Sequence, residues 1–174
     1  SRAQKRMLIV QELAPVSTAY VETIAIAAHS NVNSKQLLLE LAHIHPIIES
    51  QISFSEEIQD YVTRFVDITI SSQTYSEQKL SSLAKAREYL RTHKPVISLI
   101  DSPLVKLECI RTKEETIMAL HVHHIIVDDI TLVSLSTTMD AIVNGNCESL
   151  KPQEIDYDKF VEFHEQYLRS DTVQ

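Results

Sequence analysis

One short segment late in the chain gathers most of the side chains that could do chemistry. Residues 121–129, HVHHIIVDD, hold three histidines and two aspartates within an otherwise apolar run. A neutral imidazole can take a proton near pH 7, and a nearby carboxylate can fix its tautomer or the loop that carries it. The adjacent pair His123 and His124, followed four residues on by Asp128, therefore makes general acid/base chemistry one interpretation.

Two other interpretations of this segment stay open on the residues alone. In the first, the histidines are hydrogen-bonded polar groups at the end of a buried strand, and Asp128 or Asp129 caps the next helix. In the second, two histidines on one face and an aspartate bind zinc. A strand would point His121 and His123 to one face and His124 to the other, and the chain has no HExxH sequence. We therefore expect no metal at His121, His123, His124 and Asp128.

The segments around the histidines predict how they are held. Residues 104–112 and 115–124 are rich in β-branched and apolar side chains, and we expect them to form a hairpin that ends at the histidines. After residue 128 the apolar side chains are spaced by three and four, which indicates a helix that starts between Asp128 and Thr131 and ends at Asn144-Gly145. The candidate site thus lies where a strand meets a helix.

The remaining pattern predicts an α/β fold. We expect a two-layer sandwich with one mixed, largely antiparallel sheet. Its further elements are helices at 4–13, 33–46, 76–93 and 156–168, and strands at 20–28, 47–54 and 64–71. Asn33 with Gln36 three residues later predicts the start of the second helix.

Composition excludes several classes of function. The chain has 174 residues, enough for one domain or one large lobe, and its net charge of -8 argues against a nucleic-acid surface. Its single glycine excludes a phosphate-binding glycine-rich loop, and no apolar run is long enough for a membrane span. The cysteines Cys109 and Cys147 lack metal-ligand spacing, which favours reduced thiols and a cytoplasmic location. The start at Ser1 without a methionine suggests a piece of a longer protein.

Several motifs in order give the chain a family resemblance. The segment HHIIVDD (123–129) resembles the HHxxxDG signature of the chloramphenicol acetyltransferase-like acyltransferases, among them the condensation domains of nonribosomal peptide synthetases. Four other segments resemble further motifs of these domains, in the expected order and spacing. SRAQKRM (1–7) resembles the opening SxAQxRL motif, and HPIIESQISF (45–54) resembles the HxxLRTxF motif. PVISLIDSPLVKLECI (95–110) resembles the stretch before the histidines, and YDKFVEF (157–163) resembles the helix that ends the first lobe.

The resemblance implies a function and a set of partners. Residues 1–174 would be the N-terminal lobe of a condensation domain, completed by a C-terminal lobe. Two thioesters, each on the phosphopantetheine arm of a carrier protein from the same or a neighbouring synthetase or synthase module, would meet at His124. That histidine would act as a base or orienting group for amide, less often ester, formation, and no other cofactor is needed. His123 and Asp128 would be architectural, with Asp128 paired to a buried arginine. The lobe alone is expected to be inactive.

Two residues depart from the family pattern. Asp129 stands where the signature has glycine, and Glu49 stands where the HxxLRTxF motif has the arginine that pairs with the aspartate. Two buried like charges cannot both ionise cheaply, so we expect Glu49 to turn outward into solvent. These departures keep a second function open, a non-catalytic condensation-like module that binds carrier proteins or other synthase parts.

Overall fold

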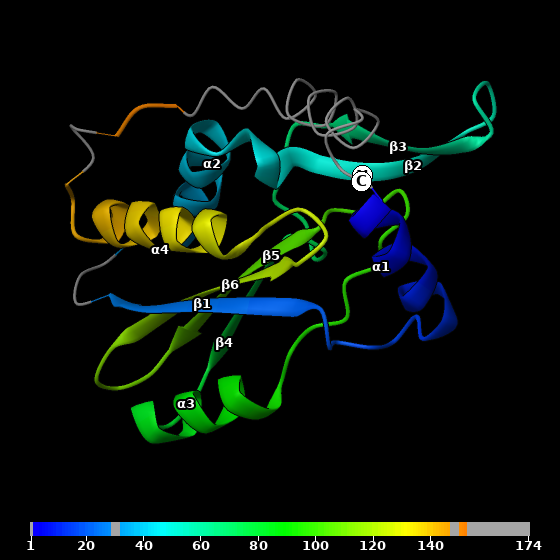
Figure 1. Cartoon of the computed structure of the whole chain (residues 1–174). Helices are drawn as coiled ribbons and strands as arrows, with labels where there is room; N and C mark the ends of the chain where they lie inside the picture. Colours follow the sequence, from blue (N-terminus) through cyan, green and yellow to red (C-terminus); the bar gives the residue numbers. More distant parts are fainter. Residues whose placement is uncertain (1, 29–31, 147–149, 153–174) are drawn as a thin grey trace, which may run out of the picture.

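A four-stranded mixed sheet forms the centre of the structure (Figure 1). The computed structural model describes residues 2–28, 32–146 and 150–152. The sheet has the order β1-β6-β5-β4, and β6 runs antiparallel to both of its neighbours while β4 runs parallel to β5. The predicted α/β fold with a mixed, largely antiparallel sheet is confirmed. The strands are β1 (Val21–Ala28), β4 (Tyr75–Lys79), β5 (Val105–Arg111) and β6 (Thr116–His123).

A separate hairpin lies beside the central sheet. The strands β2 (Ser50–Ser55) and β3 (Asp60–Phe65) pair antiparallel, directly after the 3-10 helix η1 (Pro46–Glu49). One bridge, between Ile52 and Ile100, joins this hairpin to the segment that leads into β5.

At the start of three helices a side chain accepts a hydrogen bond from a free backbone amide. The helices are α1 (Arg2–Leu13), α2 (Ser34–Ile44), α3 (Leu83–Thr92) and α4 (Asp129–Val143). Asn33 accepts a hydrogen bond from the Gln36 amide, and Asp128 accepts one from the Thr131 amide, as N-caps do. Gly145, at φ 73°, ends the turn after α4, where a left-handed residue is needed.

Helices cover both faces of the central sheet (Figure 1). On one face α2 and α4 pack on the larger core, which includes Leu107 and Leu120 of the sheet. On the other face α3 packs through Ala86 on Ile110 and Ile117. Because successive side chains of a strand alternate between faces, β6 contributes to both cores. The smaller α3 layer adds to the sandwich that the sequence predicts. None of the described helices is long and apolar enough to cross a membrane.

Three predicted elements are wrong in part. The predicted strand at 47–54 begins only at Ser50, because residues 46–49 form the 3-10 helix η1. The predicted strand at 64–71 ends at Phe65, because β3 pairs with β2 at residues 60–65, and the following residues run without strand pairing. The predicted helix at 76–93 begins only at Leu83, capped by Ser82, because residues 75–79 pair with β5 as the edge strand β4. The predicted helix at 156–168 lies outside the described residues.

Candidate active site at the end of β6

The backbone of the two adjacent histidines is fixed by neighbouring segments. The His123 amide donates to the Leu104 carbonyl (2.9 Å), and the His124 amide donates to the Tyr20 carbonyl (2.8 Å). The first contact comes from the residue before β5 and the second from the residue before β1. The predicted junction of strand and helix is confirmed, with His124 directly after β6 and α4 starting at Asp129.

His124 offers one ring nitrogen to a substrate. The residue is half-buried, and its Nδ1 is buried with no hydrogen-bond partner among the described residues. Nε2 is therefore the ring nitrogen left for an incoming group. No described carboxylate bonds the ring, so the position of His124 comes from its backbone and its packing.

His123 is a buried, neutral group. Only 1% of it is exposed, and its Nδ1 accepts a hydrogen bond from the Ile125 amide (3.1 Å). Burial, and then the nearby His124, lower the pKa of His123 to about 4. Because Nδ1 is an acceptor, the ring proton sits on Nε2 at pH 7. His123 thus holds the turn that follows β6 without carrying a charge.

Asp128 caps a helix and lies exposed at its start. Its Oδ1 accepts from the Thr131 amide (2.8 Å) and from the Thr131 hydroxyl (2.7 Å). These two hydrogen bonds lower the pKa of the Asp128 carboxyl. Asp128 has no ion pair with any described residue, so the buried arginine partner implied by the resemblance is not seen. Asp129, the first residue of α4, is exposed as well.

Glu49 does not turn into open solvent as predicted. It is half-buried at the end of η1, and its Oε1 accepts a hydrogen bond from the Ile68 amide (3.3 Å). The Ile68 amide has no strand partner after β3, so it donates to the Glu49 carboxylate. This contact keeps the Glu49 side chain from turning fully into solvent. Within the described ranges Glu49 has no ion pair with a cationic side chain.

The histidines and aspartates of the segment do not converge on one point. No group of three histidine, cysteine, aspartate or glutamate side chains in the described part of the chain is arranged to hold a metal ion. His121 and His123 alternate along β6 with Leu120 and Val122 of the larger core, whereas His124 follows the strand.

A polar network that the sequence pattern does not predict lies under α3. His121 is fully buried, with Nδ1 3.0 Å from the Thr23 hydroxyl and Nε2 3.5 Å from Oε2 of Glu108. Glu108 Oε1 also accepts from Gln78 Nε2 (3.0 Å) and the Tyr89 hydroxyl (3.1 Å). Burial raises the pKa of Glu108, but the neighbouring His121 ring and the Tyr89 hydroxyl outweigh it and leave that pKa lowered. The only signal in the sequence is one acidic residue inside an apolar strand.

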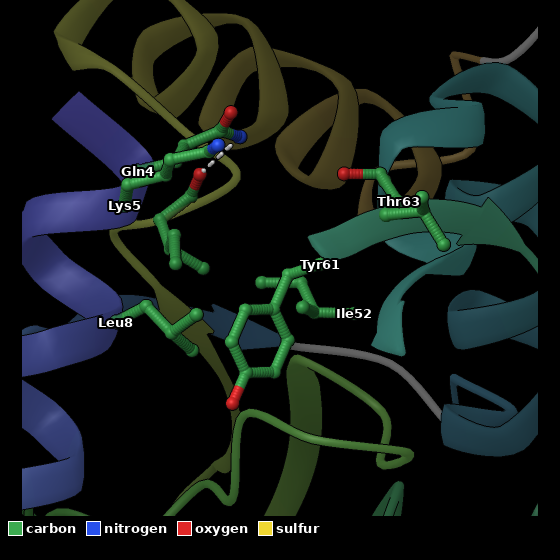
Figure 2. Close-up of a pocket in the computed structure, with 8 residues that line it drawn as sticks. Gln4, Lys5, Leu8, Ile52, Tyr61 and Thr63 are labelled. Carbon is green, nitrogen blue, oxygen red and sulfur yellow. Dashed lines mark hydrogen bonds between the residues drawn. The ribbon is translucent and has the colours of Figure 1, made fainter. Parts of the chain in front are cut away.

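The first helix reaches the loop that follows His124 (Figure 2). Gln4 Nε2 donates to the Ile125 carbonyl at 3.0 Å. Around this bond lies a small cavity of about 60 Å³ between α1 and the β2–β3 hairpin. Its lining includes Gln4, Lys5, Leu8, Ile52, Tyr61, Val62, Thr63 and Ile125.

Polar contacts also hold α1 to the hairpin. Lys5 forms an ion pair with Asp60, and the Tyr61 hydroxyl donates to Oε1 of Glu12 (2.8 Å). Buried Leu8 lies between these two contacts on the helix. The opening motif of the sequence is thus a structural connection between the hairpin and the histidine loop.

Comparisons with known proteins agree with this fold. A family model described as the condensation domain matches residues 1–174. The starter condensation domain of the rhizomide synthetase RzmA is similar in structure, with a TM-score of 0.72, 18% identity, and coverage of 98% of this chain and 43% of that chain. For the first condensation domain of the CDA synthetase the values are 0.73, 16%, 97% and 45%.

A third structure, the complex of the X-domain and OxyB from teicoplanin biosynthesis, gives a TM-score of 0.72 at 13% identity, with coverage of 95% of this chain and 37% of that chain. At such low identity these likenesses show the fold alone. The chain spans less than half the length of each of these structures.

Proposed function

This chain belongs to the condensation-domain family, and from that membership we propose that residues 1–174 are the N-terminal lobe of a condensation domain of a nonribosomal peptide synthetase. The reaction joins an acyl or aminoacyl thioester to an amine, each borne on the phosphopantetheine arm of a carrier protein. A C-terminal lobe supplies the rest of the tunnel through which the two carrier arms reach His124. In support, the chain covers 43% and 45% of the two solved condensation domains.

His124 is the residue that we propose for the chemical step. The amine nitrogen attacks the thioester carbonyl, a C–N bond forms, the C–S bond breaks, and the proton lost by the amine passes to the leaving thiolate. His124 accepts that proton or orients the amine and stabilises the charged tetrahedral intermediate. The observation that carries this assignment is its half-buried ring, held by the Tyr20 carbonyl through the backbone, with Nδ1 buried and Nε2 left for substrate.

The other two residues of the motif act through His124. His123 holds the turn through the Ile125 amide, and Asp128 holds the start of α4 through Thr131. Gln4 adds a third contact at the Ile125 carbonyl. We therefore assign all three as positioning residues.

A second candidate function is a condensation-like module that binds carrier proteins without catalysis. The observation in its favour is the missing ion pair of the motif. Exposed Asp128 has no cationic partner among the described residues, and Glu49, at the position of the expected arginine, accepts from the Ile68 amide. One of the compared structures is a complex of an X-domain with OxyB, so the fold also occurs in a protein complex.

A condensation assay with the intact parent protein distinguishes the two functions. Two loaded carrier proteins are supplied, and the joined product is measured by mass spectrometry. His124→Ala should lower the rate by about 10²–10⁴-fold. His43→Ala, which changes an exposed histidine of α2, should leave it unchanged. Carrier binding without product from the unmodified protein would favour the non-catalytic module. The 174-residue chain alone should be inactive, because both thioesters must be held in place for reaction.

A further inference from the structure

A polar pocket lies apart from the histidines, between the start of β2 and the segment that follows β3. Its volume is about 280 Å³. This is close to the lower limit of roughly 300 Å³ for small-molecule sites, so the pocket suits a group of side-chain size. The described lining comes from residues 48–51, from 66–69 with Ser71, Gln73 and Thr74, and from Asp101 and Pro103.

The pocket carries negative charge without a counter-charge. Glu49, Asp67 and Asp101 line it, and none of its described lining residues is lysine, arginine or histidine. Glu49 Oε1 already accepts from the Ile68 amide, and Asp101 Oδ1 accepts from the Ser53 hydroxyl (2.6 Å). The second oxygen of each carboxylate is left as an acceptor. Like charges gathered in this way favour the binding of a cation.

The buried hydroxyl of Ser50 also indicates that the pocket binds a ligand. Ser50 also lines the pocket, is fully buried, and its Oγ has no hydrogen-bond partner among the described residues. Buried polar groups are nearly always hydrogen-bonded, so a missing partner calls for a group beyond the described residues. The position of Ser50 next to Glu49 places that group in the pocket.

The geometry of the acceptors decides between a metal ion and an organic cation. No three carboxylate, histidine or cysteine side chains in the described ranges lie close enough together to hold one metal ion. A guanidinium is planar and has five N–H donors, so it can bridge acceptors that are further apart. We propose that this pocket binds a guanidinium group, supplied either by an arginine side chain of a partner segment or by a free guanidino compound.

The test is an NMR titration of the full ¹⁵N-labelled chain at low ionic strength. Methylguanidinium and blocked arginine (N-acetyl-arginine methylamide) are the two ligands, and methylurea is the uncharged control of the same shape. The Ile68 amide, which donates to Glu49, should shift and saturate with either cation at millimolar concentration, and methylurea should not shift it. Saturable binding of blocked arginine identifies an arginine side chain as the source of the guanidinium group. Exclusion of blocked arginine while methylguanidinium binds identifies a free compound.

Variants separate a built site from general charge attraction. Glu49→Gln and Ser50→Ala should each weaken binding roughly tenfold. Asp67→Asn, at an exposed residue, gives a further variant that should fold normally and also weaken binding. Glu56→Gln removes one exposed carboxylate from the β2–β3 turn and should have no effect. The absence of a saturable shift at Ile68, or equal weakening by Glu49→Gln and Glu56→Gln, would overturn the proposal.

Discussion

The side-chain amide of Gln4 donates a hydrogen bond to the backbone carbonyl of Ile125, across 121 positions of sequence. The bond joins the first helix to the residue directly after His124 (Figure 2). The proposed catalytic histidine therefore depends on a contact from the opposite end of the described chain.

Gln4→Ala should lower kcat of the parent protein more than it changes KM, because the variant loosens the loop that carries His124 and leaves the substrate arms bound. The loss of one hydrogen bond should reduce the free energy of unfolding by only about 1 kcal/mol. Steady-state condensation kinetics and urea denaturation measure the two effects. Gln36→Ala, at an exposed glutamine of α2, is the matched control. A variant with unchanged kcat would remove Gln4 from the positioning residues.

The buried His123 should make stability depend on pH. Its pKa falls from 6.5 to about 4 on folding, so the unfolded chain binds a proton that the folded chain refuses. Stability is therefore full above pH 6.5 and is lost as the pH falls from 6.5 toward 4, on the order of 3 kcal/mol in all. NMR of the ring protons measures the titration directly. A ring that titrates near 6.5 in the folded protein would contradict the burial.

Asp128→Ala should destabilise the protein by about 1 kcal/mol, because the N-cap of α4 is lost. Asp128→Ser, which keeps an acceptor at the cap, should restore most of the stability. Since the pKa of Asp128 is lowered, its contribution is present above the unfolded pKa and is lost as the pH falls through the folded value. Urea denaturation at neutral and acidic pH tests both statements. Equal losses in the two variants would mean that the cap is not what Asp128 supplies.

Glu108→Ala should destabilise the protein by about 1–3 kcal/mol, because buried His121 loses its carboxylate neighbour and half-buried Gln78 and Tyr89 lose their acceptor. Glu77→Ala is the control, since Glu77 forms an exposed ion pair with Arg111 and should cost less than about 1 kcal/mol. Guanidinium chloride denaturation compares the two. Similar losses for both carboxylates would show that the network under α3 contributes little.

Local signals in the sequence account for the elements that were predicted correctly. The period change at residue 128, the capping residue Asn33 and the glycine at 145 depend on neighbours within a few positions. For the same reason the β5–β6 hairpin and the start of α4 follow from the sequence alone. The motif then located His123, His124 and Asp128 at one junction.

Long-range contacts account for what was missed. The polar segment YSEQK at 75–79 is a strand because β5, much later in the chain, offers it a partner, and tertiary pairing overrides its weak propensity. The acceptor role of Glu49 depends on the Ile68 amide, and that of Glu108 on Gln78 and Tyr89. The spacing of residues in the sequence does not indicate these long-range contacts.

The different attachment of α1 and of His124 has a consequence for motion. His124 is tied by its own amide to the Tyr20 carbonyl at the sheet margin, whereas α1 meets the hairpin and the loop through side chains of Gln4, Lys5 and Glu12. The amide protons of His123 and His124 should exchange with deuterium only when the sheet opens, and those of α1 should exchange by local detachment. A binding event that displaces α1 would therefore break the Gln4–Ile125 bond and loosen the loop after His124, while the His124 amide stays bonded to the Tyr20 carbonyl.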